Sequence, residues 1–160
     1  MNVRPAAKPD HDAIWRIFRE VVAPGDTYTM DPNISREQAF GYWFRSDTKT
    51  YVAEQGGEIV GTYTLRPNRS GGGGHVSNAS FMVDPGARGR GIGKAMAEHG
   101  LDEARRLGYR AMQFNFVVST NETALRLWEN LGFAIVGTLP GAFRHPARGF
   151  VDVYVMFREL

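Results

Sequence analysis

The chain has 160 residues, of which 42% are hydrophobic, and its formal net charge is only +2, so it suits one domain with a sizeable core. It contains no cysteine, which excludes disulfides, thiolate catalysis and cysteine-bound metal, and its small charge argues against a nucleic-acid partner. No apolar run approaches the roughly 18 residues of a membrane span, and the start lacks a signal-peptide core. We therefore expect no membrane association and a cytoplasmic location.

The first half of the chain predicts three strands, two helices and a loop. Alternating apolar residues indicate the strands, and apolar residues at helical spacing indicate the helices. The predicted elements are a strand over 2–6, a helix from 10–11 to 24–25, a short helix from 35, a hairpin of strands over 49–54 and 58–65, and a loop over 66–74. The four consecutive glycines of that loop are expected to provide flexible spacing without chemistry.

A glycine-dense turn joins the next predicted strand, over 75–83, to a helix. The turn runs from Val83 to Lys94 as VDPGARGRGIGK, and apolar residues at helical spacing follow it. Its glycines expose backbone N–H groups at a helix N-terminus, which carries about half a positive charge, and its arginines add full charges. This combination predicts a pyrophosphate site, formed by Arg88, Gly89, Arg90, Gly91, Ile92, Gly93 and Lys94.

The spacing of this turn narrows the choice of ligand. A Walker loop would place Ser or Thr after Lys94, where this chain has Ala95, and a Rossmann turn would read Gly-x-Gly-x-x-Gly. The pattern Arg88-x-x-Gly91-x-Gly93 after a strand resembles instead the acetyl-CoA pyrophosphate loop of the GCN5-related N-acetyltransferase (GNAT) superfamily. Two alternatives to an acetyl-CoA loop remain: an ordinary glycine-rich connection, and a disordered Arg-Gly segment that binds RNA.

The second half of the chain resembles the second conserved block of the same superfamily. A strand over 111–118 precedes a helix that begins either with Ser119 and Glu122 at capping-box spacing or with Asn121 as the cap. Gly132 ends that helix. Beyond it the sequence predicts a strand over 133–139, an irregular segment over 140–149 and a final strand over 150–157.

The resemblance covers essentially the whole length and implies a fold class. It implies one domain over 1–160 with the α+β (α/β/α) GNAT acyl-CoA N-acyltransferase fold. In this fold a mixed, mostly antiparallel sheet of six to seven strands has splayed central strands and about four helices. The implied co-substrate is acetyl-CoA, whose pantetheine arm pairs with strand edges in the gap between the splayed strands.

The resemblance also implies cofactor contacts outside the glycine-rich turn. A backbone N–H near Phe81 or Met82 would polarise the thioester carbonyl, and Val83 would contact CoA through its backbone. Asn121 could reach the pantetheine, with helix capping as its alternative role. Trp128 stands where many relatives have a tyrosine that acts as general acid, and an indole does not release its proton at neutral pH. We expect Trp128 to pack in the core and flank the CoA sulfur.

The acceptor side is predicted mainly from two asparagines. Asn78 and Asn115 interrupt strand-like runs, where asparagine is disfavoured and where, if buried, it needs hydrogen-bond partners. The segment from 113 to 133 resembles the branch that acetylates azetidine-2-carboxylate and related proline analogues. That resemblance implies that both asparagines bind the acceptor and act in catalysis, by holding it or an ordered water. A β-bulge is the structural alternative for each.

Two further residues are candidates for substrate contact. Tyr28 follows the first helix, and Arg144 lies in the predicted irregular segment; both regions line the acceptor cleft in the GNAT fold. Arg144 or Arg148 could hold a substrate carboxylate in bidentate fashion, with an exposed basic loop as the alternative. No carboxylate occupies the usual position of the general base, so a water relay held by neutral side chains is our expectation. No spacing typical of metal ligands occurs, and we expect no metal.

Three functional classes follow from these observations. The first is an acetyl-CoA-dependent N-acetyltransferase that acts on the amine of a small molecule, such as an amino acid or proline analogue. The second is a protein acetyltransferase that acts on lysine or N-terminal amines. The third is a CoA-binding regulatory module without turnover, which the missing tyrosine and glutamate would explain. Relatives are often homodimers, so a homodimer is also an expectation from the resemblance.

Overall fold

One seven-stranded sheet runs through the computed structural model, which describes residues 1–160. The strands lie in the order β1-β2-β3-β4-β5-β7-β6, and every neighbouring pair is antiparallel except β4 and β5. The strands are β1 (Asn2–Pro5), β2 (Lys49–Gln55), β3 (Glu58–Pro67), β4 (Val76–Val83), β5 (Ala111–Val118), β6 (Ala134–His145) and β7 (Gly149–Glu159). The helices are α1 (His11–Val22), α2 (Arg36–Trp43), α3 (Ile92–Arg106) and α4 (Glu122–Asn130), with short 3-10 turns at Lys8–Asp10, Gly71–Gly73 and Pro85–Ala87.

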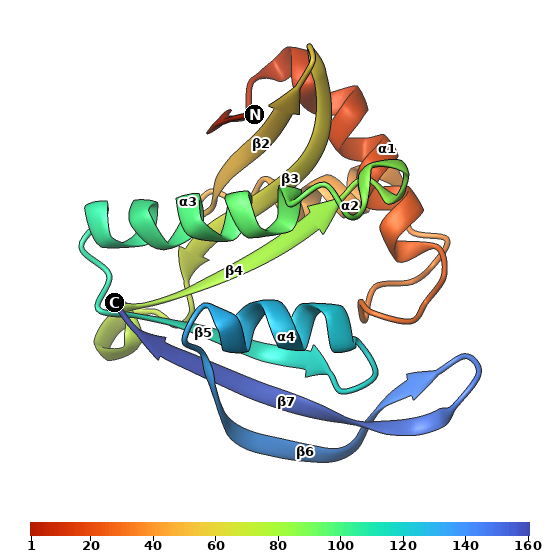
Figure 1. Cartoon of the computed structure of the whole chain (residues 1–160), viewed down its shortest axis with the longest axis vertical. Helices are drawn as coiled ribbons and strands as arrows, with labels where there is room; N and C mark the ends of the chain where they lie inside the picture. The colour runs from red at the N-terminus through yellow and green to blue at the C-terminus, as the bar shows by residue number, and fades with distance from the viewer.

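The helices cover the two faces of the sheet in pairs, as Figure 1 shows. On one face α3 and α4 pack on a core that includes Tyr63, Met96 and Phe114. On the other face α1 and α2 pack on a second core that includes Trp43 and Met82. The layered α+β class, the mixed seven-stranded sheet and the four α-helices predicted from the sequence are therefore confirmed.

The central strands separate soon after they begin to pair. β4 and β5 are joined only at Val76–Ala111 and Ser77–Met112, and the two strands diverge beyond that point. A bulge in β5 lies between Phe114 and Val117, where the register with β7 shifts. The bulge contains Asn115, so the structural role proposed for that residue is present. The divergence leaves an opening in the middle of the sheet.

One local prediction is wrong, and tertiary contacts explain the difference. The segment 140–149 is not irregular, because β6 continues to His145 and pairs with β7 around a register shift between Leu139 and Phe143. Pro140 is tolerated because β6 is the edge strand, and the N–H of Gly141 donates to Asp152 Oδ1 at 2.9 Å.

The start of α4 depends on an asparagine cap alone. Asn121 Oδ1 accepts a hydrogen bond from the Ala124 N–H at 3.3 Å, so Asn121 is the N-cap. The capping box between Ser119 and Glu122 is absent, because Ser119 lies outside the helix and its N–H pairs with the Asp152 carbonyl of β7. The last strand of the sheet thus decides between the two caps that the sequence leaves open.

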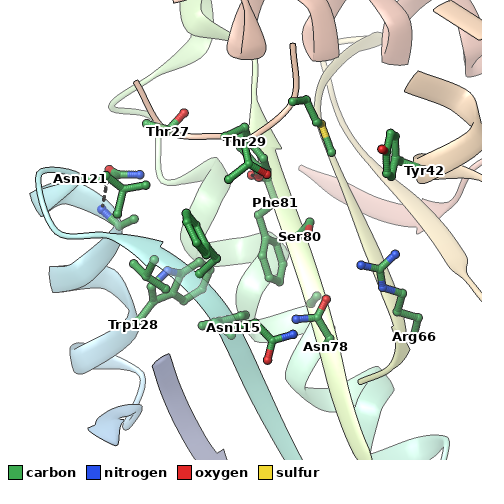
Figure 2. Close-up of a pocket in the computed structure, with 18 residues that line it drawn as sticks. Thr27, Thr29, Tyr42, Arg66, Asn78, Ser80, Phe81, Asn115, Asn121 and Trp128 are labelled. Atoms are coloured by element: carbon green, nitrogen blue, oxygen red, sulfur yellow. Dashed lines mark hydrogen bonds between the residues drawn. The ribbon is translucent and has the colours of Figure 1, made fainter. Parts of the chain in front are cut away.

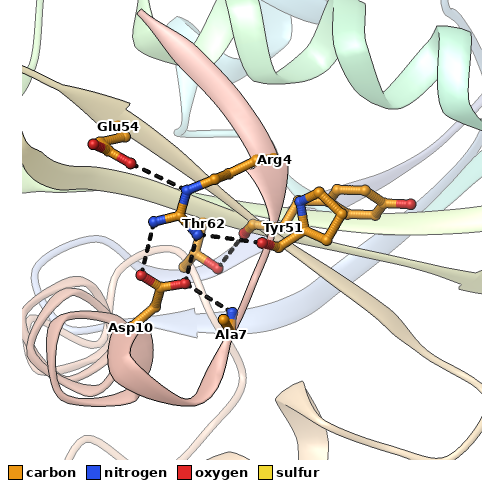
Figure 3. A network of polar contacts seen from close by, with 7 residues as sticks. Arg4, Ala7, Asp10, Tyr51, Glu54 and Thr62 are labelled. Atoms are coloured by element: carbon orange, nitrogen blue, oxygen red, sulfur yellow. Dashed lines mark hydrogen bonds and ion pairs between the residues drawn. The ribbon is translucent and has the colours of Figure 1, made fainter.

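A buried carboxylate ties the first strand to the rest of the fold. Arg4 of β1 donates to both oxygens of Asp10, at 2.8 and 3.0 Å, and to Glu54 of β2 at 3.1 Å (Figure 3). The Ala7 N–H donates to Asp10 at 2.8 Å. The hydrogen bond with Arg4 holds the pKa of Asp10 below its ordinary value.

The longest helix, α3, has 15 residues, and none of the helices combines the length and apolar character needed to cross a membrane.

Acid should weaken the fold partly through Glu103 on α3. The bidentate contact with Arg106 and the hydrogen bond from Tyr51 lower the pKa of Glu103 from 4.5 to about 2. Because the pKa is lower in the folded state, this carboxylate contributes stability above about pH 4.5 that is lost as the pH falls toward 2. In urea unfolding at a series of pH values, Glu103→Gln should therefore flatten the acid-side fall of the unfolding free energy. Glu98→Gln, on the exposed side of the same helix, should leave this acid-side fall unchanged. If the unfolding free energy falls with pH at the same slope in both variants, this assignment is contradicted.

Candidate functional site

A cavity of about 380 Å³ occupies the opening between β4 and β5 (Figure 2). The loop after α1, helices α2 and α4, and strands β3, β4 and β5 all contribute to its wall. Most lining residues are apolar or neutral polar side chains. The complete lining is Thr27, Tyr28, Thr29, Met30, Tyr42, Arg66, Asn78, Ala79, Ser80, Phe81, Phe114, Asn115, Phe116, Val117, Val118, Asn121, Ala124 and Trp128.

The backbone of β4 presents hydrogen-bond donors to this opening. The Asp84 N–H pairs with the Val60 carbonyl of β3 at 2.9 Å, and antiparallel strands alternate the direction of their donors. The N–H groups of Ala79, Phe81 and Val83 therefore point away from β3, toward the opening. Met82 pairs with Thr62 of β3 and buries its side chain in the core under α1, at 1% exposure. Of the two amides that the resemblance suggests, the one at Phe81 faces the cavity.

Tyr28 connects the loop after α1 to the same point of β4. Its hydroxyl donates to the Phe81 carbonyl at 2.7 Å, which holds the Phe81–Met82 peptide unit at the edge of the opening. Burial raises the pKa of the Tyr28 hydroxyl well above its ordinary value. The phenol therefore stays protonated and acts as a donor.

The glycine-rich turn leads from the end of β4 into the N-terminus of α3. Gly91 is the N-cap residue, with a φ of +75°, and no side chain caps the first turn of the helix. The first-turn N–H groups at Ile92, Gly93 and Lys94 are consequently open to a ligand. Arg88 and Arg90 are exposed beside them. These residues fit a diphosphate group, because uncapped amides and guanidinium groups converge on one exposed turn.

An ion pair holds this turn against the neighbouring helix. Asp84 pairs with Arg16 of α1 at 2.7 Å, and its other oxygen accepts from the Gly86 N–H at 2.8 Å. Burial raises the pKa of Asp84, but the hydrogen bonds from Arg16 and Gly86 outweigh it and leave the pKa below its ordinary value. Asp84 is therefore occupied in supporting the turn.

The two asparagines meet at the cavity, each with partners of its own. Asn78 Nδ2 donates to the Gln113 carbonyl of β5 at 2.9 Å and so bridges the point where the strands diverge. Asn115 donates to Asn68 Oδ1 at 2.7 Å and accepts from Gln113 Nε2 at 2.9 Å. Each amide keeps hydrogen-bonding capacity beyond these contacts, since its oxygen has two lone pairs and its nitrogen two protons.

Of the other predicted site residues, two line the cavity and one does not. Trp128 lines the cavity and is also core, at 8% exposure, with its ring 4.5 Å from that of Phe114. Asn121 lines the cavity while capping α4. Arg144 does not line the cavity; it lies on the β6–β7 hairpin, with its guanidinium 6.0 Å above the Phe150 ring. The expected irregular loop that would have carried Arg144 to the acceptor side is a regular hairpin.

The residue that sequence analysis missed is Arg66, which supplies the only formal charge in the cavity wall. It is the register partner of Asn78 across β3 and β4. No local pattern distinguishes it from other strand-end arginines, because its position depends on how the two strands pair. Burial lowers the pKa of Arg66, and neighbouring Arg45 lowers it further.

The comparisons with known proteins agree with this geometry. The model of the Acetyltransferase (GNAT) family matches residues 11–133. A GCN5-related N-acetyltransferase from Kribbella flavida is 46% identical with a TM-score of 0.95, over 99% of this chain and 97% of that one. The yncA protein from Salmonella typhimurium, solved with its cofactor acetyl-CoA, is 26% identical with a TM-score of 0.88, over 100% and 94% of the two chains. The L-amino acid N-acyltransferase MnaT of Escherichia coli is 28% identical, over 88% of this chain and 83% of its own.

Proposed function

The chain belongs to the acetyltransferase (GNAT) family, and on that basis we propose that it transfers an acetyl group from acetyl-CoA to the amine of a small molecule. One observation carries the proposal: the uncapped N-terminus of α3 and the free edge of β4 lead into a cavity with polar side chains on its far wall. The names of MnaT and of related amino-acid acetyltransferases support a small amine as acceptor.

The residues of this chain would hold acetyl-CoA at three places. Amides of the turn, with Arg88 and Arg90, would bind the diphosphate, and the N–H groups of Ala79 and Val83 would pair with the pantetheine amides. Acetyl-CoA supplies an acetyl group activated as a thioester. The Phe81 N–H, next to the carbonyl that the Tyr28 hydroxyl holds, would donate to the oxygen that gains charge during transfer.

Positioning accounts for most of the catalysis that we propose. Holding an amine against an activated acyl group can contribute roughly 7–11 kcal/mol in favourable cases. In the transfer, the acceptor nitrogen would attack the thioester carbonyl, the carbon–sulfur bond would break, and CoA would leave as its thiolate. The nitrogen must also lose a proton as it becomes an amide, and the CoA thiolate ends as the thiol. Asn78, Ser80 and Asn115 line the cavity and are too weakly basic to take up this proton, so it would leave through water that these side chains could hydrogen-bond.

A thiol-release assay distinguishes the functional classes. Acetyl-CoA is offered with separate panels of free amino acids, proline analogues and lysine-containing peptides, and the release of CoA thiol is followed. We expect release with free amino acids or their analogues. Release with peptides alone would favour a protein acetyltransferase, and tight CoA binding without release from any amine would favour a regulatory module.

Replacing Asn115 with alanine tests its role in acceptor binding. Loss of one substrate hydrogen bond should raise the KM for the acceptor by roughly five- to tenfold. The KM for acetyl-CoA should change little. An acceptor KM and kcat equal to those of the wild type would show that Asn115 serves only the bulge and its amide contacts.

The proposal includes three finer points. Residues 1–160 act as one catalytic domain, which is supported by the single sheet that joins all the elements. The protein is cytoplasmic, as its composition suggests. It forms a homodimer, which is supported by exposed Ile135, Val136 and Leu139 on the edge strand β6, and sedimentation analysis of the Val136→Asp variant against the wild type would test this.

A further inference from the structure

Arg66 is a half-buried cation whose own chain provides no counter-ion. It supplies the only formal charge among the residues that line the cavity, and its guanidinium forms no ion pair within the protein. Asp47 is the carboxylate that acts on its pKa, and Asp47 is paired with Arg45 at 3.1 Å. A guanidinium removed from water and left unpaired favours an anionic ligand, since the ligand replaces the hydration that burial removes.

The register of β3 and β4 places this cation on the side of the sheet opposite α3. Arg66 follows Thr62 and Thr64 along one face of β3, and Thr62 bonds to Trp43 of α2 on that side. Asn78, its register partner, shares this face with Ser80 and with Met82 under α1. In Figure 2 the Arg66 side chain extends toward Tyr42 of α2. The diphosphate site at the start of α3 and this cation therefore lie on opposite sides of the opening.

The spacing along β4 suits a small zwitterion. Asn78 and Phe81 are three residues apart, about 10 Å along the strand at a rise of ~3.4 Å per residue. An extended arginine side chain and a short substrate together can cover such a distance. An anion bound at Arg66 would direct the other end of its molecule toward the Phe81 N–H.

We propose that Arg66 binds the carboxylate of the acceptor, and that the acceptor is therefore an α-amino acid or a close analogue with a free carboxylate. This inference depends on the proposed acetyltransferase function for its amine. The planar guanidinium can accept a carboxylate in bidentate fashion, which orients the substrate as well as attracting it. Asn78, directly opposite Arg66, offers its amide oxygen to the amine side of the same molecule.

Kinetics with matched substrates test the assignment. Each accepted amino acid is compared with its own α-carboxamide, which keeps the amine and side chain but removes the negative charge. The wild type should favour the acid over the amide by roughly ten- to a hundredfold in kcat/KM. Arg66→Met should bring this ratio close to one, and Arg66→Lys should retain part of it because the charge remains without the fork.

Two arginine variants serve as controls. Arg69→Met removes an exposed cation from the loop that follows β3 and should leave the acid-to-amide ratio unchanged. Arg144→Met removes the other arginine that the sequence suggests for binding the carboxylate, and it should also leave the ratio unchanged because Arg144 does not line the cavity. If Arg144→Met abolishes the discrimination, or if Arg66→Met leaves it intact, the inference is overturned.

A binding measurement separates this inference from the proposed function. Thermal shifts with the common L-amino acids, L-methionine sulfone and their α-carboxamides need no turnover and are recorded in the presence of CoA. We expect at least one acid to stabilise the wild type more than its amide does, and to lose that advantage in Arg66→Met. Such binding without acetyl transfer would contradict only the proposed function. Equal stabilisation by every acid and its amide would contradict the role of Arg66 whatever the turnover.

Discussion

Replacing Gly91 with valine should weaken CoA binding by roughly ten- to a hundredfold. Gly91 has a φ of +75°, which a β-branched residue adopts only at a cost of about 1–3 kcal/mol. The turn of the variant should relax to a negative φ and turn the first N–H groups of α3 away from the diphosphate. Calorimetric titration with CoA measures the change directly.

Gly57 provides a matched control for this experiment. It has a φ of +84° in the turn between β2 and β3, and an added side chain there would likewise meet open space. Gly57→Val should lower thermal stability through the same backbone strain while the affinity for CoA stays unchanged. Unchanged affinity in Gly91→Val, or an equal loss in both variants, would show that the turn does not bind the diphosphate.

Replacing Arg4 with methionine should lower the unfolding free energy by about 2 kcal/mol. Asp10 has a side chain that is only 8% exposed, and the variant would leave its carboxylate with the Ala7 N–H as a remaining donor. For a chain of this length, the loss corresponds to roughly 4–8 °C in Tm. Urea unfolding at neutral pH measures the free energy, and a calorimetric scan measures the Tm.

An exposed ion pair provides the comparison for Arg4. Arg36 pairs with Asp12 at 2.7 Å, but the Asp12 side chain is 88% exposed. Arg36→Met should therefore change stability by less than about 0.5 kcal/mol, because solvent screens the pair. If Arg4→Met is equally mild, water reaches Asp10 and the network does not stabilise the first strand.

Some of the site could be predicted because the relevant signal is local. The turn from Val83 to Lys94 contains its own glycines, its own charges and the start of its own helix, so the prediction of a diphosphate site there needs no distant partner. The start of α4 depends on more than its local sequence. Two caps are compatible with the sequence there, and the pairing of Ser119 with β7 leaves Asn121 as the cap.

The arginine proposed to bind the substrate carboxylate could not be identified from local sequence. Arg144 lies in a segment that the sequence predicts to be irregular, Arg66 lies at the start of a predicted loop, and neither local pattern shows which arginine faces the cavity. Pairing between β6 and β7 removes Arg144 to an exposed hairpin, and pairing between β3 and β4 sets Arg66 opposite Asn78. Register joins residues far apart in the chain, so it cannot be inferred from spacing within one segment.

The sequence by itself determined the family, through the resemblance of its two motifs, and with the family the class of fold; it also predicted a diphosphate turn, because glycine placement and helix periodicity act over a few neighbouring residues. Only the tertiary structure decided which amide of β4 faces the opening, which arginine enters the cavity and where the last hairpin runs. These features depend on the pairing of distant strands. Strand register fixes which N–H groups and which side chains point to each side.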